Sequence, residues 1–259
     1  MVYDSYRLHR REFPWRQTDD PYRILVSEIM LQQTQTARVL PKYEQFIAAF
    51  PDFAAVDDAR QSEVLKLWQG LGYNRRAVAL KKAARIVERD CHGLLPASLD
   101  KLLALPGVGR YTAAAILAFA FNQPAILIET NIRAVCIHHF FGGRTDVRDA
   151  EIAPLVEQTL DRSQPREWYY ALMDYGVVLK KTNRNVGRRS AHYQKQSRFT
   201  GSNRQLRGRV LRLLLGRPGS TARALALQLD ADADRLRKVL AELQAEGFIA
   251  GLRGRYRVA

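Results

Sequence analysis

Cysteine is scarce in this chain, whose 259 residues include only Cys91 and Cys136. Two thiols cannot build a disulfide framework, and they cannot supply the four ligands of a cysteine-only zinc or iron–sulfur site. We therefore expect no cofactor and no metal. Because disulfides are rare where thiols are kept reduced, this composition also favours a reducing cytoplasm.

Long apolar runs are lacking as well, although 47% of the residues are hydrophobic. The longest such run, residues 112–121, is too short to cross a bilayer and is followed by Asn122, Gln123 and Pro124. The first residues contain no apolar signal core. We therefore expect a globular protein of the cytoplasm, neither inserted in a membrane nor exported.

Acidic residues are few near the C-terminus. Residues 180–259 contain 19 Lys or Arg against 5 Asp or Glu, whereas residues 1–179 contain 22 against 21, which together give the net charge of +15. A near-neutral body with a strongly basic end is typical of a protein that binds nucleic acid. A solvated basic surface without a partner and a membrane-binding surface are the alternatives.

Strand patterns are also missing before residue 245. Apolar residues recur at helical spacing, and Pro, Gly and short polar turns separate the segments. Residues 180–202 are basic and rich in Asn, Gly and Ser, which indicates a loop or linker, with one short helix inside it. The predicted helices are 2–11, 21–31, 35–49, 52–57, 61–68, 74–90, 98–104, 110–121, 129–140, 149–160, 165–179, 190–196 and 203–215.

The pattern changes after residue 203. Helices at 203–215, 222–229 and 232–246 precede two short strands at 247–250 and 254–258, an order that fits a winged-helix-like module. Such modules read DNA in some proteins and serve as dimerisation or docking pieces in others. Basic side chains on the third helix and in the wing favour DNA contact, namely Arg235, Arg237, Lys238, Arg253, Arg255 and Arg257.

Glu28 stands on an apolar helix face. It follows Ile24 by four residues and precedes Leu31 by three, so the three side chains share one stripe. Burying a carboxylate there is costly and raises its pKa, which suits a proton donor at neutral pH. The alternative is that the helix turns enough to let Glu28 reach water.

Residues 105–109 (LPGVG) join two predicted helices. The glycines Gly107 and Gly109 allow a turn whose backbone N–H groups point outward, and the next helix, which starts at Arg110, adds its positive N-terminal dipole. Such a hairpin holds a phosphate backbone without reading bases. A plain helix–helix corner is the alternative.

A second carboxylate, Glu129, ends the apolar run of residues 125–128 and begins a helix with Asn131 and Arg133. The dipole of a helix N-terminus favours the ionised form of this group. Glu28 is thus biased toward the protonated form and Glu129 toward the charged form, as a pair that cleaves a glycosidic bond requires. Simple helix capping is the alternative for Glu129.

At this point the chain resembles the helix-hairpin-helix DNA glycosylases, in particular their MutY-type adenine glycosylase branch. The resemblance covers roughly residues 5–180, and SEIMLQQTQ is its most specific stretch. The matching stretches are FPWR (13–16), DPYRILVSEIMLQQTQ (20–35), LWQGLGYNRR (67–76), LPGVGRYTAAA (105–115), ETNIRAV (129–135) and YALMDYG (170–176).

The resemblance implies an all-α fold of two lobes, roughly 21–133 and 1–20 plus 134–200, with the winged-helix-like module at 203–259. It implies that a flipped base lies in a cleft between the lobes.

The resemblance also implies roles for single residues. Glu28 resembles the acid that protonates the departing base, and Glu129 takes the place of an aspartate that stabilises the cationic sugar, oriented by Tyr111 and Asn131. Tyr111 also stands where relatives with lyase activity carry a Schiff-base lysine, so we expect a monofunctional glycosylase. On the DNA side, Gln32 and Gln33 resemble residues that enter the opened duplex, and Tyr73 resembles the wedge beside the estranged base. Arg75, Gly107, Gly109, Arg110 and Arg133 are further expected DNA contacts.

The sequence departs from the family in three ways. Glu129 is one methylene longer than aspartate, the C-terminal domain that inspects 8-oxoguanine is not recognisable, and the four cluster cysteines are missing. Lys180 stands where the first of these cysteines would fall. We expect the basic segment after it to grip the DNA backbone in place of a cluster loop, with Lys180, Lys181, Arg188 and Arg189 as contacts.

The leading hypothesis is therefore a base-excision DNA glycosylase that removes a mispaired base from duplex DNA, most specifically adenine opposite guanine or 8-oxoguanine. One alternative is a glycosylase for thymine or uracil opposite guanine, or for a deaminated purine. Another is a non-catalytic DNA-binding or regulatory protein. The sequence gives no indication of a protein partner.

Overall fold

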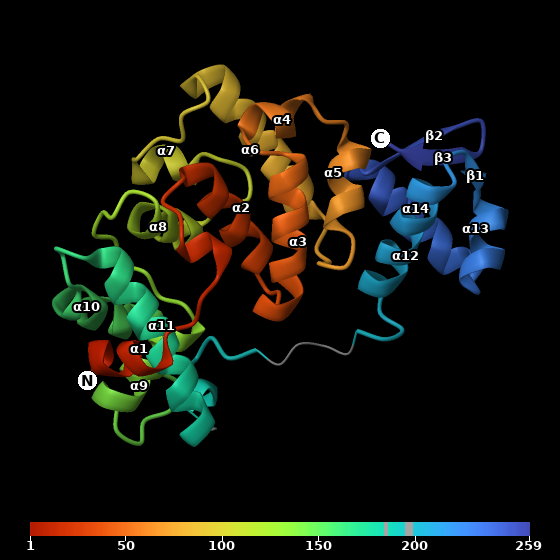
Figure 1. The fold of residues 1–259 in the computed structure, drawn as a ribbon. Coiled ribbons are helices and arrows are strands. Elements are labelled where there is room, and N and C mark those ends of the chain that lie inside the picture. Colours follow the sequence, from red (N-terminus) through yellow and green to blue (C-terminus); the bar gives the residue numbers. More distant parts are fainter. Residues whose placement is uncertain (184–185, 195–198) are drawn as a thin grey trace. The chain divides into compact units, whose positions relative to one another are not determined.

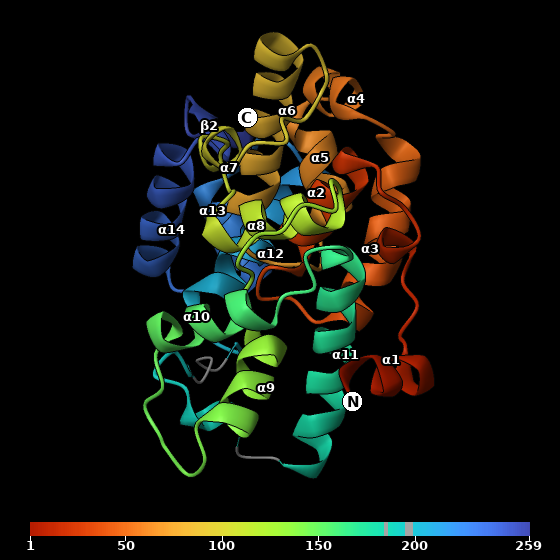
Figure 2. The ribbon, with the colours of Figure 1, turned by 90° about the vertical axis from the view of Figure 1, so that its left-hand side faces the viewer.

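The computed structural model describes residues 1–183, 186–194 and 199–259 (Figures 1 and 2). Contacts define two compact units: unit 1 comprises residues 1–32 and 94–195, and unit 2 comprises residues 33–93 and 196–259. This division differs from the expected one, because residues 203–259 pack against helices of residues 33–93 and share a unit with them.

Unit 1 is helical and has α2 and α8 at its apolar centre. All residues from Ile24 to Met30 and from Thr112 to Phe119 are buried. Asp20 caps α2 by accepting a hydrogen bond from the backbone of Tyr22 at 2.9 Å. The elements are α1 (Val2–His9), η1 (Pro14–Arg16), α2 (Pro21–Leu31), α7 (Leu99–Leu103), α8 (Arg110–Phe119), α9 (Thr130–Phe140), α10 (Asp149–Thr159), α11 (Pro165–Thr182) and η2 (Val186–Arg189).

Asp174 on α11 anchors the N-terminal segment of unit 1. Its exposed fraction is 1%, and its two oxygens accept hydrogen bonds from Arg16 at 2.8 and 3.1 Å. The Arg11 backbone and side chain donate to the same carboxylate at 2.9 and 2.6 Å. A buried carboxylate that is fully paired in this way is costly to disturb. These contacts fix the residues just before α2, which carries Glu28.

Unit 2 combines four helices with the C-terminal module. The helices are α3 (Thr36–Ala49), α4 (Phe53–Asp58), α5 (Gln61–Trp68) and α6 (Arg75–Cys91). The module consists of α12 (Asn203–Gly216), β1 (Ser220–Thr221), α13 (Ala222–Leu229), α14 (Ala233–Ala245), β2 (Ile249–Leu252) and β3 (Arg255–Val258). Its antiparallel sheet has the order β1-β3-β2. Three helices with a small sheet match the predicted winged-helix-like module.

The predicted all-α fold with a small C-terminal α/β module is confirmed, and most helices begin and end close to the predicted residues. No helix of the described residues has the length and apolar character needed to cross a membrane. The expectation that no strand forms before residue 245 fails at two places. β1 forms before residue 245, and Ser190 makes an isolated bridge to Val147.

The predicted helix at 190–196 is wrong at residues 190–194, and residues 195–196 lie outside the described residues. The Val147 N–H donates to the Arg189 carbonyl, and the Ala191 N–H donates to the Val147 carbonyl, both at 3.0 Å. These bonds use backbone groups that a helix would need. The predicted loop at 180–202 is also interrupted, because α11 continues to Thr182 and η2 follows.

Helices α9 and α11 pack side by side in unit 1 at a very short distance (Figure 2). Gly176 makes this possible: a Cβ atom at this position would lie 2.6 Å from the Asn131 carbonyl oxygen and 2.7 Å from Asn131 Cβ. No real side chain tolerates such contacts, so the backbones would have to separate. Gly176 thus sets the position of the start of α9, where Glu129 lies.

We predict that Gly176→Ala lowers the free energy of unfolding by about 1–3 kcal/mol, the usual cost of overpacking. Gly208→Ala is the matched control, because it is also helical but a Cβ there meets no atom within 4 Å. Removing glycine's excess freedom at that site should stabilise the protein by about 0.5–1 kcal/mol. Urea unfolding followed by circular dichroism measures both; equal stability of Gly176→Ala and wild type would contradict the proposed constraint.

Candidate active site

Glu28 lies on α2 in the apolar centre of unit 1. Its exposed fraction is 4%, so the alternative in which it reaches water is wrong. Burial raises the pKa of Glu28 to about 7; a hydrogen bond from Tyr111 partly opposes this shift, and the charge of Glu129 adds to it. Among the described residues, Glu28 Oε2 has no hydrogen-bond partner. A carboxyl group in this setting retains its proton up to near-neutral pH.

Tyr111 on α8 interacts electrostatically with both carboxyl groups. Burial raises the pKa of Tyr111 well above its ordinary value, and the charges of Glu28 and Glu129 act in the same direction. The Tyr111 hydroxyl and the Glu28 carboxyl group also influence each other's pKa, since Tyr111 lowers that of Glu28 and Glu28 raises that of Tyr111. Both carboxyl groups thus act electrostatically on one hydroxyl of unit 1. The structure thus brings Glu28, Tyr111 and Glu129 together.

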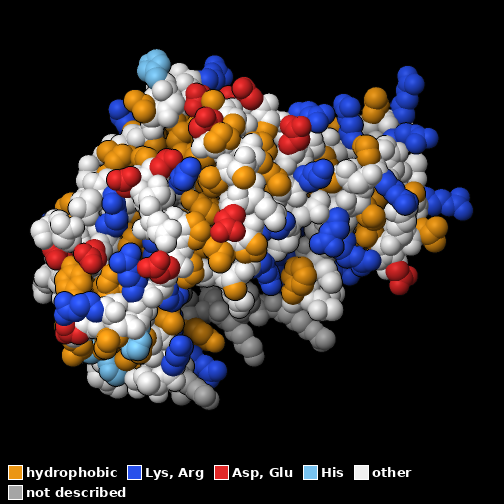
Figure 3. Space-filling model, viewed as in Figure 1, with side chains coloured by type: hydrophobic (Ala, Val, Ile, Leu, Met, Phe, Trp, Pro, Cys, Tyr) orange, Lys and Arg blue, Asp and Glu red, His pale blue; other side chains and the backbone are white. Residues whose placement is uncertain are grey.

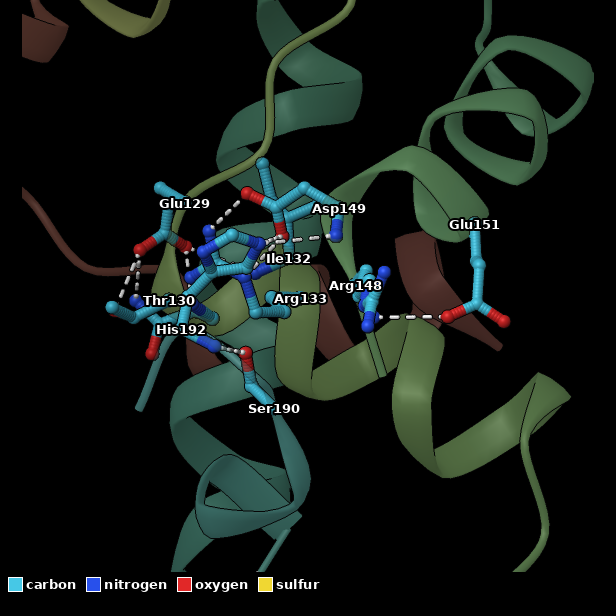
Figure 4. Close-up of polar contacts among 10 residues, drawn as sticks. Glu129, Thr130, Ile132, Arg133, Arg148, Asp149, Glu151, Ser190 and His192 are labelled. Atoms are coloured by element: carbon cyan, nitrogen blue, oxygen red, sulfur yellow. Dashed lines mark hydrogen bonds and ion pairs between the residues drawn. The ribbon is translucent and has the colours of Figure 1, made fainter. Parts of the chain in front are cut away.

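Glu129 is the N-cap of α9 (Figure 4). Its Oε1 accepts from the backbone N–H groups of Asn131 at 2.7 Å and Ile132 at 3.0 Å. Its Oε2 accepts from the Thr130 hydroxyl at 2.9 Å. Capping, the alternative interpretation of this residue, is therefore present. It is compatible with a charged functional group, because helix N–H groups and the dipole both stabilise an anion.

Asn131 lies between Glu129 and α11. Its Nδ2 donates to Glu129 Oε2 at 3.2 Å, and its Oδ1 accepts from Lys180 Nζ at 2.8 Å. Asn131 therefore contacts Glu129 directly, as the orienting role implied by the resemblance requires. Tyr111, which was given the same role, interacts electrostatically with both Glu28 and Glu129, and its orienting role stays a prediction.

The hairpin before α8 has the backbone geometry expected from its glycines. Gly107 has a φ of 81°, a conformation that glycine adopts without strain, and Gly109 is exposed as the N-cap of α8. Arg110 is exposed beside it. Gln32 Nε2 donates to the Gly107 carbonyl and to the Thr112 hydroxyl, both at 3.1 Å. The hairpin and Gln32 thus form one connected surface element of unit 1.

The basic residues predicted to grip DNA in unit 1 fall into two groups. Lys181 and Arg188 are exposed. Arg133 forms a two-bond ion pair with Asp149 at 2.6 and 2.7 Å (Figure 4), and Arg189 donates to the carbonyl oxygens of Arg144 and Phe141 near the end of α9. Arg133 and Arg189 therefore hold α9 in place, a role that the sequence did not reveal.

In unit 2, Tyr73 stands in a turn with unusual backbone geometry. Gly70, Gly72 and Tyr73 have φ values of 95°, 73° and 48°, and Gln33, also in unit 2, has a φ of 55°. A bulky aromatic residue rarely adopts this left-handed conformation, so its surroundings must hold it there. Strain of this kind is typical of functional contacts.

The C-terminal module contributes to holding this turn. Arg204 Nη1 donates to the Tyr73 hydroxyl at 2.6 Å. The guanidinium groups of Arg204 and Arg76 lie 5.7 and 5.5 Å from the centre of the Tyr73 ring. Arg76 also donates to the Thr34 hydroxyl at 3.0 Å, which ties residue 34 to the same turn. Nothing in the sequence pointed to Arg204.

Arg75, which is predicted to contact DNA, pairs with the module, and its DNA contact stays a prediction. It donates two hydrogen bonds to Glu246 at 2.8 and 2.7 Å, and Arg207 donates to the same carboxylate at 2.7 Å. The Arg75 hydrogen bond is the main reason that the pKa of Glu246 falls to about 2. Gln61 adds a hydrogen bond to the Gly247 carbonyl at 2.9 Å. These contacts attach the module to α5 and α6.

The residues present do not fit an iron–sulfur cluster. Cys136 is buried on α9 of unit 1, whereas Cys91 ends α6 of unit 2, and Lys180 donates to Asn131 where the first cluster cysteine would stand. In the part of the chain that the structure describes, no three His, Cys, Asp or Glu side chains gather as a metal site.

Comparison with known proteins identifies the family. The model of the HhH-GPD superfamily of base excision DNA repair proteins matches residues 26–157. The chain belongs to this superfamily. The resemblance inferred from the motifs is thereby confirmed.

Relatives within the superfamily extend this result. The adenine DNA glycosylase of Mycobacterium tuberculosis is 34% identical over 81% of this chain and 75% of its own length. That of Buchnera aphidicola is 35% identical over 66% of this chain, which spans about half of that relative (49%). A solved structure of a thermostable thymine-DNA glycosylase is 32% identical, with a TM-score of 0.62, over 68% of this chain and 83% of that one.

The raised pKa of Glu28 predicts how stability depends on pH. The folded protein keeps this proton up to about pH 7, whereas the unfolded chain releases it near the ordinary value of 4.5. The free energy of unfolding should therefore fall as pH rises through this window, by about 3 kcal/mol from this group. Glu28→Gln cannot ionise, so it should become more stable than wild type above pH 7.

Urea unfolding at about pH 5 and about pH 8 measures this difference. Glu157→Gln is the control, because Glu157 is exposed on α10, with only a 3.6 Å ion pair to Arg162. Parallel pH dependence of wild type and Glu28→Gln would mean that Glu28 titrates as an exposed side chain does.

Proposed function

We propose that this chain is a monofunctional DNA glycosylase that removes adenine opposite guanine or 8-oxoguanine from duplex DNA. The observation that carries the proposal is the pair of carboxyl groups that both act on Tyr111: Glu28 is buried with its pKa raised to about 7, and Glu129 is held by the N-terminus of α9. The adenine DNA glycosylases at 34 and 35% identity support adenine as the base.

The chemistry follows from the two environments. Glu28 gives its proton to the base as the bond between the base and the sugar C1′ breaks, so that the base leaves as a neutral molecule. Positive charge then develops on the sugar, and the Glu129 carboxylate stabilises it. Water adds to C1′, and the proton that it loses restores the protonated form of Glu28. Tyr111 offers no amine at the lysine position of relatives with lyase activity, so strand cleavage through an imine is not expected.

A second candidate is a glycosylase for thymine or uracil opposite guanine. The similarity to a thymine-DNA glycosylase at 32% identity favours it, since that level is close to the identity with the adenine enzymes. The same two carboxyl groups would serve either base. A protein that binds DNA without cleaving any base is the third candidate.

Single-turnover excision on a panel of duplexes separates these candidates. We expect abasic product from adenine opposite 8-oxoguanine or guanine, and a loss of rate of about 10²–10⁴-fold in Glu28→Gln and about 10²–10³-fold in Glu129→Gln. Glu157→Gln should retain the wild-type rate. Product only from thymine or uracil would establish the second candidate, and tight binding without product from any duplex the third.

The basic C-terminal module supports binding to DNA. In Figure 3, Lys and Arg side chains are spread over the elements of the module, and Arg253 and Arg257 are exposed on its wing. Exposed arginine side chains bind phosphate oxygens without reading the base sequence. We propose that this surface binds the DNA backbone outside the active site, together with Lys181 and Arg188.

The double variant Arg253→Ala and Arg257→Ala should weaken duplex binding and reduce the slope of log affinity against log salt by about two, because each arginine neutralises one phosphate. Lys82→Ala with Arg89→Ala removes the same charge from exposed positions of α6 and is the control. Fluorescence anisotropy over a salt titration measures the slopes. Equal slopes for the two double variants would show that the wing makes no specific phosphate contact.

A further inference from the structure

The orientation of the Asn131 side-chain amide is fixed from both sides. On one side, the Glu129 carboxylate can only accept hydrogen bonds, so the amide must present its Nδ2 at 3.2 Å. On the other side, the Lys180 ammonium can only donate, so the amide must present its Oδ1 at 2.8 Å. Only one of the two amide orientations satisfies both neighbours. Lys180 and Glu129 are thus connected through one side chain.

The backbone supports the same arrangement. Gly176 precedes Lys180 by four residues on α11, so the two positions share one helix face. At Gly176 the two helix backbones meet at the Asn131 carbonyl, closer than any Cβ would allow. One turn later, Lys180 reaches the side chain of the same residue. Helix α11 therefore contacts both the backbone and the side-chain amide of Asn131.

The charge of Lys180 acts on the site as well. Burial lowers the pKa of Lys180, and the negative charge of Glu129 works against this shift, so the two groups attract each other. Arg133 opposes that attraction with its own positive charge, although Asp149 pairs with it in two hydrogen bonds. No hydrogen bond joins Lys180 directly to Glu129 among the described residues. Its influence on Glu129 passes through Asn131 and through space.

We infer that Lys180 is a positioning residue for Glu129, which it holds by fixing the amide of Asn131. This inference rests on the proposed function for the role of Glu129, and it replaces the expectation that Lys180 grips the DNA backbone. At the position where relatives have a cluster cysteine, this chain has the cation of Lys180. Its positive charge stabilises the Glu129 carboxylate. Lys181, next on α11, is exposed.

Three substitutions at one position test the inference through their rank order. Lys180→Gln keeps a donor for Asn131 Oδ1 without the charge, Lys180→Met keeps the length but no donor, and Lys180→Glu turns the amide around by accepting from Nδ2. The rate of single-turnover excision should therefore decrease in the order wild type, Lys180→Gln, Lys180→Met, Lys180→Glu. We expect a loss of about tenfold for Lys180→Met and about a hundredfold for Lys180→Glu. A role in packing alone would make Met the mildest substitution.

The matched control is Lys181→Met, one residue further along the same helix. Duplex affinity and its salt slope should change little in Lys180→Met, whereas the excision rate should change little in Lys181→Met. If Lys180→Met instead retains the wild-type rate and loses affinity and about one unit of salt slope, Lys180 is a phosphate contact and the inference is wrong.

A second measurement does not depend on activity. The side-chain amide of Asn131 gives a pair of ¹⁵N–¹H resonances, assigned by their disappearance in Asn131→Asp. We expect these resonances to shift and to exchange faster with water in Lys180→Met, and to stay unchanged in Lys181→Met. Unchanged resonances in Lys180→Met would overturn the inference. Absence of excision by the wild type on every duplex would overturn the proposed function, while the resonances still report on the contact itself.

Discussion

Burying a carboxyl group costs free energy unless the group keeps its proton or finds partners. Glu28 is buried on α2 with one oxygen unpartnered among the described residues, and a second carboxylate lies nearby. The surrounding fold must supply the energy that holds this helix in place. Asp174, paired with Arg11 and Arg16, fixes the segment before α2, and the apolar face of α8 covers it.

The second carboxylate has the opposite environment. Glu129 accepts from two backbone N–H groups, a hydroxyl and an amide, and Lys180 adds positive charge behind that amide. Its Oε1 accepts from the backbone of its own helix while Oε2 meets Asn131. The two glutamates thus lie in opposite surroundings, one apolar and one rich in hydrogen-bond donors, which is how two identical residue types can take different roles.

Much of this was predictable from the sequence. The spacing around Glu28 predicted its burial, the glycines of residues 105–109 predicted the hairpin, and the change of pattern at residue 203 predicted the C-terminal module. The contacts of Lys180, Arg133 and Arg75 were not predictable. A basic residue in a sequence indicates a surface charge, and only the packing of α9, α10, α11 and the module reveals the acceptors that hold these three. The pairing of residues 189–191 with Val147 was hidden for the same reason, since a bridge to a distant residue leaves no local pattern.

Glu246 joins two segments that the ribosome makes far apart in time. Residues 33–93 emerge early, but their partners Arg204 and Glu246 emerge only after the whole second segment of unit 1. Contacts between such distant segments form slowly, because a long loop must close first. The turn that carries Tyr73 therefore receives its Arg204 partner only once the module is being made. A nascent chain that ends before the module contains both carboxyl groups but lacks the complete support of this turn. The chain of unit 1 is therefore complete before that of unit 2.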